Sequence, residues 1–559
     1  MLWRSAPMHL QELIRAAQTA QGISPEHAPI EYRSIAHLLA TQLDTRPNQT
    51  FMIYYSEDSS RSVWTYRDFI NYAARTAQFL RAYGLSPGDR FATAAHNHPE
   101  TIAQYLAGWL LGCCVVPLNM TEEDSRLHYI LQTSGAKLLL CRPEYESRAS
   151  TFTEGLSIET ILCDSRYIAR VQQCDPIKLD TERSELDSEA LLVFTSGTTG
   201  NPKGVVLVQR NLLADAQGIA QWHRITPHDR MMCVLPIHHV NGTIVTHITP
   251  LYVGASVVLN RKFQTEHFFP RIAAEGVTIV SVVPTLLAFL LEANADDCGV
   301  RQKGFRHIIC GAGPLTCELA ARFENRYGIR IIHGYGLSET TCYSCFLELD
   351  LSDQEHQKWM QNYGFPSIGV PIPQNEMAIH DPNGKPLGEG ERGEIVIRGW
   401  NVMKGYDANP DANFAAFTYG WFRSGDEGFF IRSSDGRPYF FITGRLKELI
   451  IRGGVNIAPL EIDEVLARAP GVRAGIAVGF EHDLYGEEVG ALVIPELGVS
   501  QEAILAYCQQ HLPFHKCPKV ILFTDALPVT STGKYQRNRV KHLFAQWRSV
   551  QFQKESARA

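Results

Sequence analysis

Long hydrophobic runs are missing from this sequence, since nowhere do about 18 apolar residues follow one another. The N-terminal segment MLWRSAPMHLQELIRAAQ also has no continuous apolar stretch of the kind that a secretory signal needs. We therefore expect no transmembrane segment and a cytoplasmic location. A weak mitochondrial presequence is the alternative, because this segment is poor in acidic residues and can form an amphipathic helix.

An excess of positive charge is missing as well. The 52 Lys and Arg residues are outnumbered by 59 Asp and Glu residues, and the formal net charge is -7. No global positive field would draw the chain to nucleic acid or to an anionic membrane. We therefore expect no nucleic-acid partner, and any phosphate must be bound by local groups.

Paired cysteine spacings that build zinc sites are also missing. The 13 cysteines are scattered, and the closest groupings are Cys113-Cys114 and Cys342-Tyr-Ser-Cys345. They are typical of reduced, structural thiols.

The chain has 559 residues, more than one hydrophobic core usually supports. From residue 189 to 335, apolar β-type runs alternate with helical patterns, which predicts parallel strands with covering helices. After residue 390, short strands with Gly-rich turns predict a β-rich subdomain, and a compact α+β pattern follows. The expected fold class is α/β, with a large, multilayered N-terminal domain of mixed and parallel sheets (1–445) and a small α+β C-terminal domain (446–559).

The most informative segment is residues 195–204, Thr-Ser-Gly-Thr-Thr-Gly-Asn-Pro-Lys-Gly, between two predicted strands. Its small hydroxyl residues and glycines let backbone N–H groups approach phosphate oxygens, while Lys203 supplies positive charge. It is not a Walker A loop, because Pro202 precedes the lysine and Gly204 follows it. Composition alone would equally suit a flexible surface turn.

Further motifs follow this loop in a fixed order. They are Pro236-Ile-His-His-Val-Asn-Gly242, Gly311-Ala-Gly-Pro-Leu315, Gly334-Tyr-Gly-Leu-Ser-Glu-Thr340, Gly390-Glu-Arg-Gly-Glu-Ile395, Gly420-Trp-Phe-Arg-Ser-Gly-Asp426, Gly444-Arg-Leu-Lys-Glu448, Arg452-Gly-Gly454 and Pro528-Val-Thr-Ser-Thr-Gly-Lys534. Together with the loop, they resemble the adenylate-forming superfamily of acyl-CoA synthetases, aryl-CoA ligases, luciferases and peptide-synthetase adenylation domains. The resemblance covers residues 195–534.

The resemblance implies where ATP binds. The β- and γ-phosphates would be held by Thr195, Ser196, Gly197, Thr198, Thr199, Gly200 and Lys203. Thr198 and Glu339 would be the partners of Mg²⁺, a hard cation that suits oxygen ligands and phosphate. The nucleoside would contact Gly311, Ala312, Gly313, Tyr335 on adenine, Gly336, Ser338, and Asp426 and Arg445 on the ribose. From composition alone, Asp426 would only form a turn after Trp421 and Phe422.

The C-terminal motifs imply a moving domain that serves two half-reactions. By resemblance, Lys534 bridges the substrate carboxylate and the α-phosphate, and Lys447 is the hinge. After rotation, Gly453 and Gly454 would admit the pantetheine arm of coenzyme A.

The acid-binding side is implied by the His-His block. His239 matches the family's pocket histidine better than His238 does, although either could be a structural histidine. The block has no acidic residue to pair with an α-ammonium group, which disfavours amino acids as substrates. We expect the pocket to be lined by Trp222, Val240, the segment from Ser281 and the region after Thr340. The segment 342–366 is longer than the family pattern, and it either shapes this pocket or forms a peripheral loop.

The resemblance therefore implies an ATP-dependent acid-thiol ligase that forms an acyl-AMP from a small-molecule carboxylic acid. Its cofactors would be ATP, Mg²⁺ and coenzyme A, or a carrier-protein phosphopantetheine in place of coenzyme A. The alternatives are an acyl-AMP ligase that loads a carrier protein and a catalytically silent nucleotide-binding homologue.

Overall fold

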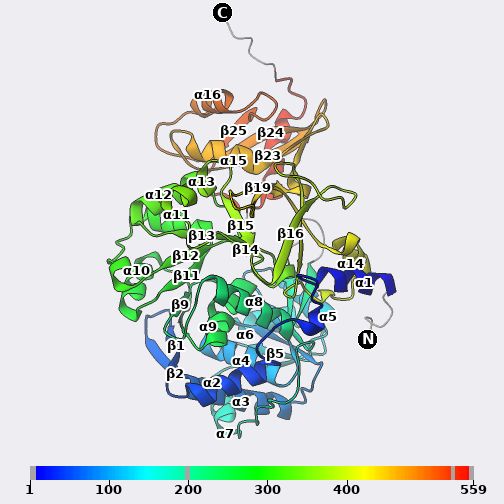
Figure 1. The fold of residues 1–559 in the computed structure, drawn as a ribbon, viewed down its shortest axis with the longest axis vertical. Coiled ribbons are helices and arrows are strands. Elements are labelled where there is room, and N and C mark those ends of the chain that lie inside the picture. Colours follow the sequence, from blue (N-terminus) through cyan, green and yellow to red (C-terminus); the bar gives the residue numbers. More distant parts are fainter. Residues whose placement is uncertain (1–7, 196–201, 531–534, 553–559) are drawn as a thin grey trace, which may run out of the picture.

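The computed structural model describes residues 8–195, 202–530 and 535–552, whose strands form three sheets. The fold is mixed α/β, and a smaller C-terminal part sits at one end of a large body (Figure 1). This confirms the predicted fold class.

The largest sheet has 13 strands, and its parallel half carries the site. These strands are almost entirely apolar and buried, as expected where helices cover both faces of a sheet. They are β9 (Arg230–Cys233), β10 (Ser256–Asn260), β11 (Ile279–Val282), β12 (His307–Cys310) and β13 (Ile331–Tyr335). At the far end β10 pairs with β1 (Thr50–Tyr55), which pairs with β2 (Arg61–Thr65).

The predicted β-rich subdomain is an antiparallel continuation of this same sheet. Its strands are β14 (Cys345–Phe346), β15 (Ser367–Pro371), β16 (Asn375–His380), β17 (Gly393–Gly399), β19 (Phe422–Arg432) and β20 (Pro438–Arg445). The turn at residues 433–436 connects β19 to β20, and Gly436 there has a φ of 86°.

The second sheet corrects one expectation about strand direction. Its order is β18-β8-β7-β4-β3-β5-β6, and β7 (Glu189–Thr195) and β8 (Lys203–Val208) are antiparallel neighbours in it. The prediction that these two strands are parallel was wrong. The connection from Thr195 to Lys203 is too short for a crossover, which needs about a dozen residues.

The remaining strands of this sheet come from the first part of the chain and from the segment after β17. They are β3 (Arg90–Ala94), β4 (Cys114–Leu118), β5 (Leu138–Cys141), β6 (Glu159–Leu162) and β18 (Gly405–Tyr406).

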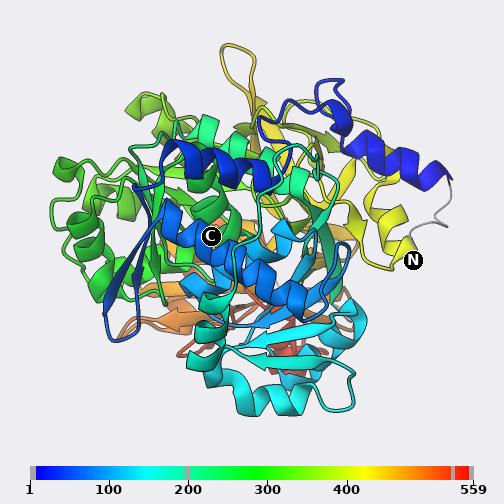
Figure 2. The same cartoon turned by 90° about the horizontal axis from the view of Figure 1, so that it is seen from below.

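Helices from the first part of the chain hold the two sheets together. Seen from below, the blue helices lie across the middle of the molecule, between its green and cyan parts (Figure 2). The three helices are α2 (Ile35–Thr45), α3 (Tyr66–Ala82) and α4 (Pro99–Leu110). Helix α3 starts at a capping box between Thr65 and Asp68, and α4 is buried along nearly its whole length.

The C-terminal part has its own five-stranded sheet and its own hydrophobic clusters. The elements are β21 (Ile450–Arg452), β22 (Val455–Ile457), α15 (Pro459–Arg468), β23 (Val472–His482), β24 (Gly486–Pro495), α16 (Gln501–His511) and β25 (Val520–Phe523). A core of this kind is what an independently folding unit needs. The boundary between residues 445 and 446 stays a prediction.

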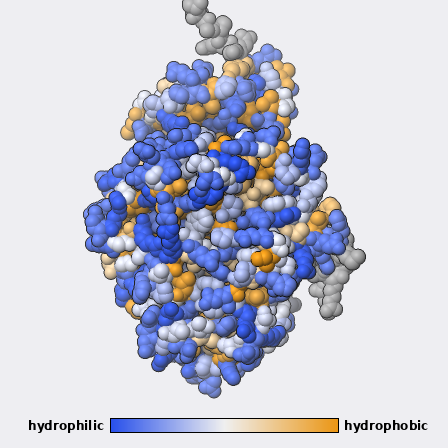
Figure 3. Space-filling view, viewed as in Figure 1, coloured by the Kyte–Doolittle hydropathy of each residue, from blue (hydrophilic) through white to orange (hydrophobic). Residues whose placement is uncertain are grey.

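Hydrophilic residues cover most of the face shown in Figure 3, and hydrophobic ones are scattered among them. Within the described ranges, no helix has the length and apolarity to cross a membrane.

Candidate active site

A cavity of about 340 Å³ opens where the carboxyl ends of the parallel strands face the C-terminal part. This edge of an α/β sheet is where ligands usually bind. The large body contributes Ala312, Gly313, Tyr335, Gly336, Asp426 and Arg445 to the lining. The C-terminal part contributes Glu448, Thr530, Tyr535, Gln536 and Arg537.

Three of the predicted nucleoside residues are in direct contact. The Tyr335 hydroxyl donates a hydrogen bond to Asp426 Oδ2 at 2.7 Å, and Arg445 Nε lies 3.4 Å from Asp426 Oδ1. Burial, together with the Asp426 carboxylate, raises the pKa of Tyr335 well above its ordinary value, so the phenol stays neutral. A carboxylate held in this way can accept hydrogen bonds from the two hydroxyls of a ribose.

The sequence context of Asp426 suggested a turn, but the residue does not lie in one. It lies inside the long strand β19, directly opposite Arg445 on β20, and is only 3% exposed. Gly425, with a φ of 74°, and a register shift after Glu427 bend the strand without ending it.

The loop after β12 has a backbone that suits close approach by a ligand. A side chain at Gly311 would begin 2.6 Å from Tyr343 Oη and 2.8 Å from the carbonyl oxygen of Gly334, so only glycine fits there. Ala312 has a φ of 65°, a conformation that non-glycine residues rarely adopt.

The predicted phosphate-binding groups are connected by a residue that the motifs did not identify, Tyr406 of β18. Its hydroxyl donates to Glu339 Oε1 at 2.9 Å, and Lys203 Nζ lies 4.2 Å from the centre of its ring. Burial lowers the pKa of Lys203, and nearby Lys447 lowers it further, although Glu339 opposes the shift. The pairing of β18 with β8, which brings Tyr406 next to Val205, could not be read from sequence spacing.

A strained turn follows Glu339. Thr341 has φ 64° and ψ -57°, and Cys342 N donates to Thr340 O at 2.7 Å, which makes this a γ-turn with positive φ. Such a conformation is rare for a β-branched residue, and strain of this kind is concentrated at functional sites. The chain reverses its direction at this turn, with Glu339 before it and Tyr343 after it.

The two histidines of the acid-side motif lie on a loop that a distant side chain anchors. Asn97 donates to the carbonyl oxygen of Leu235 at 2.9 Å and accepts from Ile237 N at 2.9 Å. The same loop continues into His238 and His239. Burial lowers the pKa of His238 well below its ordinary value, so it is neutral, and its Nε2 has no partner among the described residues.

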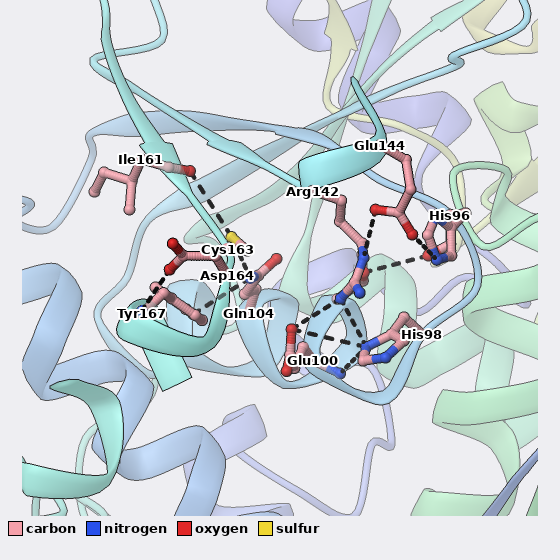
Figure 4. Close-up of polar contacts among 11 residues, drawn as sticks. His96, His98, Glu100, Gln104, Arg142, Glu144, Ile161, Cys163, Asp164 and Tyr167 are labelled. Atoms are coloured by element: carbon pink, nitrogen blue, oxygen red, sulfur yellow. Dashed lines mark hydrogen bonds and ion pairs between the residues drawn. The ribbon is translucent and has the colours of Figure 1, made fainter. Parts of the chain in front are cut away.

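In the sequence, Asn97 lies between two histidines, His96 and His98, that belong to a polar cluster at the ends of β3 and β5 (Figure 4). Arg142 Nη1 donates to Glu100 Oε2 at 2.8 Å and lies 3.0 Å from His98 Nδ1, while His96 Nε2 lies 3.7 Å from Glu144 Oε1. Burial lowers the pKa of His96 to about 2 and that of His98 to about 3, so both rings are neutral. The cluster therefore holds the segment that carries Asn97, and sequence reasoning missed it because its members are far apart in the chain.

Other predicted residues are not gathered at the cavity. Gly453 and Gly454 form the exposed turn between β21 and β22 and do not line it. Lys447 lies in a short 3-10 helix directly after β20. Ser338 is half-buried beside Glu339.

Six predicted site residues lie outside the described residues: Ser196, Gly197, Thr198, Thr199, Gly200 and Lys534. Their neighbours are informative, because Thr530 and Tyr535, on either side of the gap that contains Lys534, both line the cavity.

Known proteins match nearly the whole chain. Residues 39–407 match the family model of AMP-binding enzymes, and residues 461–534 match that of the AMP-binding enzyme C-terminal domain. The sulfoacetate–CoA ligase of Cupriavidus necator is 34% identical over 91% of this chain and 97% of its own length. The oxalate–CoA ligase of Arabidopsis thaliana is 34% identical over 85% of this chain and 92% of its own length.

Solved structures agree with the sequence matches. ATP-bound MatB from Rhodopseudomonas palustris superposes with a TM-score of 0.80 at 26% identity, covering 91% of this chain and 99% of that one. The o-succinylbenzoate CoA synthetase (MenE) of Bacillus subtilis, in complex with its acyl-adenylate intermediate, gives 0.78 at 28% identity, covering 90% and 98%. The relatives named here include acid–CoA ligases, and this chain matches them over nearly their whole length. The chain therefore belongs to the AMP-binding enzyme family.

Proposed function

We propose that this chain is an ATP-dependent acid–CoA ligase that activates an organic acid as its acyl-AMP. The observation that carries the proposal is the cavity in which Tyr335, Asp426 and Arg445 of the body face Thr530 and Tyr535 of the C-terminal part. The relatives' names add that each couples an organic acid to coenzyme A.

In the first half-reaction, a carboxylate oxygen of the acid attacks the α-phosphorus of ATP. The new P–O bond forms as the bond to the pyrophosphate oxygen breaks, and the leaving pyrophosphate takes the electron pair. Catalysis needs the two anions positioned in line and their charge neutralised. We assign positioning of the nucleoside to Tyr335, Asp426 and Arg445, and charge neutralisation to Lys203 and Lys534.

Mg²⁺ fits the phosphate side of this arrangement. The ion typically uses one or two protein carboxylates together with substrate phosphates, and it would supply charge neutralisation to those phosphates. Glu339 offers such a carboxylate, because Tyr406 donates to one of its oxygens and leaves the other for a ligand. Thr198 is the second proposed partner.

In the second half-reaction, the thiolate of coenzyme A attacks the acyl carbon and AMP leaves. We propose that rotation of the C-terminal part about Lys447 brings the turn at Gly453 and Gly454 to the site for this step. Those glycines lie on an exposed turn in the present arrangement, so a rearrangement is required before they can contact the substrate.

The test is a reaction of purified protein with ATP, MgCl₂, coenzyme A and a panel of carboxylic acids. We expect AMP, pyrophosphate and acyl-CoA to appear in equal amounts for at least one acid. Turnover only when a holo carrier protein replaces coenzyme A would show that the acceptor is wrong. ATP binding without pyrophosphate release from any acid would show that the chain is not a ligase.

A further inference from the structure

The segments predicted to line the acid pocket converge on one side chain, that of Tyr343. Asn241 begins a π-helix (η4, Asn241–Ile248), a helix type that is rare and frequent at functional sites. Ser281 lies in β11, and Tyr343 follows the γ-turn at Thr341. All three reach the carboxyl edge of the parallel sheet, next to the nucleotide cavity.

The Tyr343 phenol is held on several sides. Asn241 Nδ2 donates to Tyr343 Oη at 3.2 Å, and Ser281 Oγ donates to Asn241 Oδ1 at 2.9 Å. The ring centre lies 4.4 Å from that of Phe346, and the residue is 2% exposed. A side chain held in this way keeps one conformation and forms a rigid wall.

This wall stands directly behind the backbone that borders the nucleotide cavity. A Cβ atom at Gly311 would lie 2.6 Å from Tyr343 Oη, and one at Gly336 would lie 2.8 Å from Tyr343 Cα. Gly336 itself lines the cavity, as do Ala312 and Gly313, which follow Gly311. The space behind this backbone is therefore filled by the phenol, and an acyl group that extends from the cavity toward β11 meets it.

We infer that Tyr343 closes the acid pocket and restricts the enzyme to short carboxylic acids. The inference rests on the proposed ligase function and names its substrate class. A longer chain would collide with a ring that hydrogen bonds hold in place.

Family membership alone does not decide the size of the acid. The relatives include ligases named for oxalate and sulfoacetate, which are short and polar, and others named for feruloyl and indoleacetate groups, which are aromatic. The assignment therefore depends on Tyr343 and its partners in this chain.

The first measurement uses the wild-type protein and pyrophosphate release. We expect oxalate, malonate or sulfoacetate to give a kcat/KM more than about 100-fold above that of octanoate or ferulate, since each excluded methylene group costs about tenfold or more. Octanoate or ferulate as the better substrate would overturn the inference and leave the ligase function intact. Absence of pyrophosphate release from every acid would overturn both.

The second measurement compares two variants at the same position. We expect Tyr343→Ala to raise the kcat/KM for octanoate or ferulate by at least about tenfold, because the truncated side chain opens the pocket. Tyr343→Phe keeps the ring and removes only the hydroxyl, so it should still exclude these acids. Equal gains in both variants, or no gain in a Tyr343→Ala protein that binds ATP as the wild type does, would contradict the role of the ring as a wall.

A binding experiment does not depend on how well a variant folds. Adenosine sulfamates carrying an acetyl or an octanoyl group mimic the acyl-AMP without reacting. We expect the wild-type protein to bind the acetyl analogue more than about tenfold more tightly by calorimetry. Tighter binding of the octanoyl analogue would overturn the inference.

Discussion

At the scale of single residues, Tyr406 connects two groups that we assign to the phosphates of ATP. It donates a hydrogen bond to Glu339 and packs its ring under Lys203. Tyr406 contacts both charged residues from β18, a strand to which neither of them belongs. Its position depends on the pairing of β18 with β8.

Replacing Tyr406 by phenylalanine removes the hydrogen bond and keeps the ring beside Lys203. A hydrogen bond to a charged group contributes about 1.5–3 kcal/mol, so we expect the KM for MgATP to rise about tenfold or more. The melting temperature should change little. Steady-state kinetics with varied MgATP and direct titration of Mg²⁺ in the presence of ATP would both report the change. The remote variant Tyr507→Phe, in α16, serves as the control, and an unchanged KM for Tyr406→Phe would contradict the role.

Asp426 is the residue through which Tyr335 and Arg445 meet. We expect Asp426→Asn to raise the KM for ATP about tenfold, because the neutral amide no longer pairs with Arg445 and accepts ribose hydroxyls less well. The KM for the acid should stay nearly constant. Asp229→Asn is a suitable control, since Asp229 is also buried and paired with an arginine, Arg306 at 3.0 Å, but lies away from the cavity. Similar effects of the two substitutions on the KM for ATP would indicate a general loss of stability.

At the scale of elements, Thr530 and Tyr535 both line the cavity, and we propose that Lys534, which lies between them in the sequence, binds the acid and the α-phosphate. We expect Lys534→Ala to slow adenylation by about 100-fold or more, the usual effect of removing one group that stabilises transition-state charge. Thioester formation from supplied acyl-AMP should be affected far less, because that step would use a rotated domain. Separate assays of the two half-reactions check this, and equal losses in both would count against the assignment.

The long segment 342–366 divides into two elements with different surroundings. Its first part, which includes β14, is buried. Its second part forms α13 (Asp353–Gln361), in which Trp359 stacks on Tyr439 of β20 with ring centres 3.9 Å apart. The role of the first part as a wall of the acid pocket stays a prediction.

At the scale of the whole molecule, one buried carboxylate joins the C-terminal part to the body. Both oxygens of Glu464, on α15, accept the Cys317 N–H at the start of α12 (Cys317–Tyr327), at 3.0 and 3.1 Å. Burial raises the pKa of Glu464 to about 7, although the Cys317 N–H and nearby Arg468 favour the charged form. The docked arrangement therefore prefers the protonated carboxyl group.

The raised pKa predicts that docking weakens as the pH rises. An exposed Glu464 would have the ordinary pKa of 4.5, so the proton stabilises docking fully below that pH, and the contribution is lost as the pH rises through about 7. The contribution is on the order of 3 kcal/mol at most. We expect tryptic cleavage after the exposed Lys447, the proposed hinge, to accelerate between about pH 5 and pH 8, after correction for the pH dependence of trypsin itself.

Glu464→Gln tests the cause of this pH dependence. Glutamine resembles the protonated carboxyl group, so we expect corrected cleavage of this variant to be slow and nearly independent of pH. Glu502→Gln, on the exposed face of α16, should behave like the wild type. If cleavage of Glu464→Gln has the same pH profile as cleavage of the wild type, another group controls docking.

The sequence by itself determined the fold class and the succession of motifs, and it predicted the candidate nucleoside residues. Tyr335, Asp426 and Arg445 could be identified because each lies in a short motif whose pattern is local, and α8 (Gln209–Trp222) and α15 could be predicted from helical periodicity. Local patterns record which residues a segment contains. They do not record which segment lies beside it.

Only the tertiary structure decided the contacts between segments. The antiparallel pairing of β7 with β8, the hydrogen bond from Tyr406 to Glu339 and the docking of Glu464 on α12 each join residues that no spacing rule connects. Tyr343 is the clearest example, because its hydroxyl meets Asn241, and Asn241 meets Ser281, only when a loop, the start of a helix and a strand from separate parts of the chain come together. Long-range packing of this kind sets the shape of a pocket that selects an acid. The residues predicted to bind the nucleotide, in contrast, lie in short contiguous motifs.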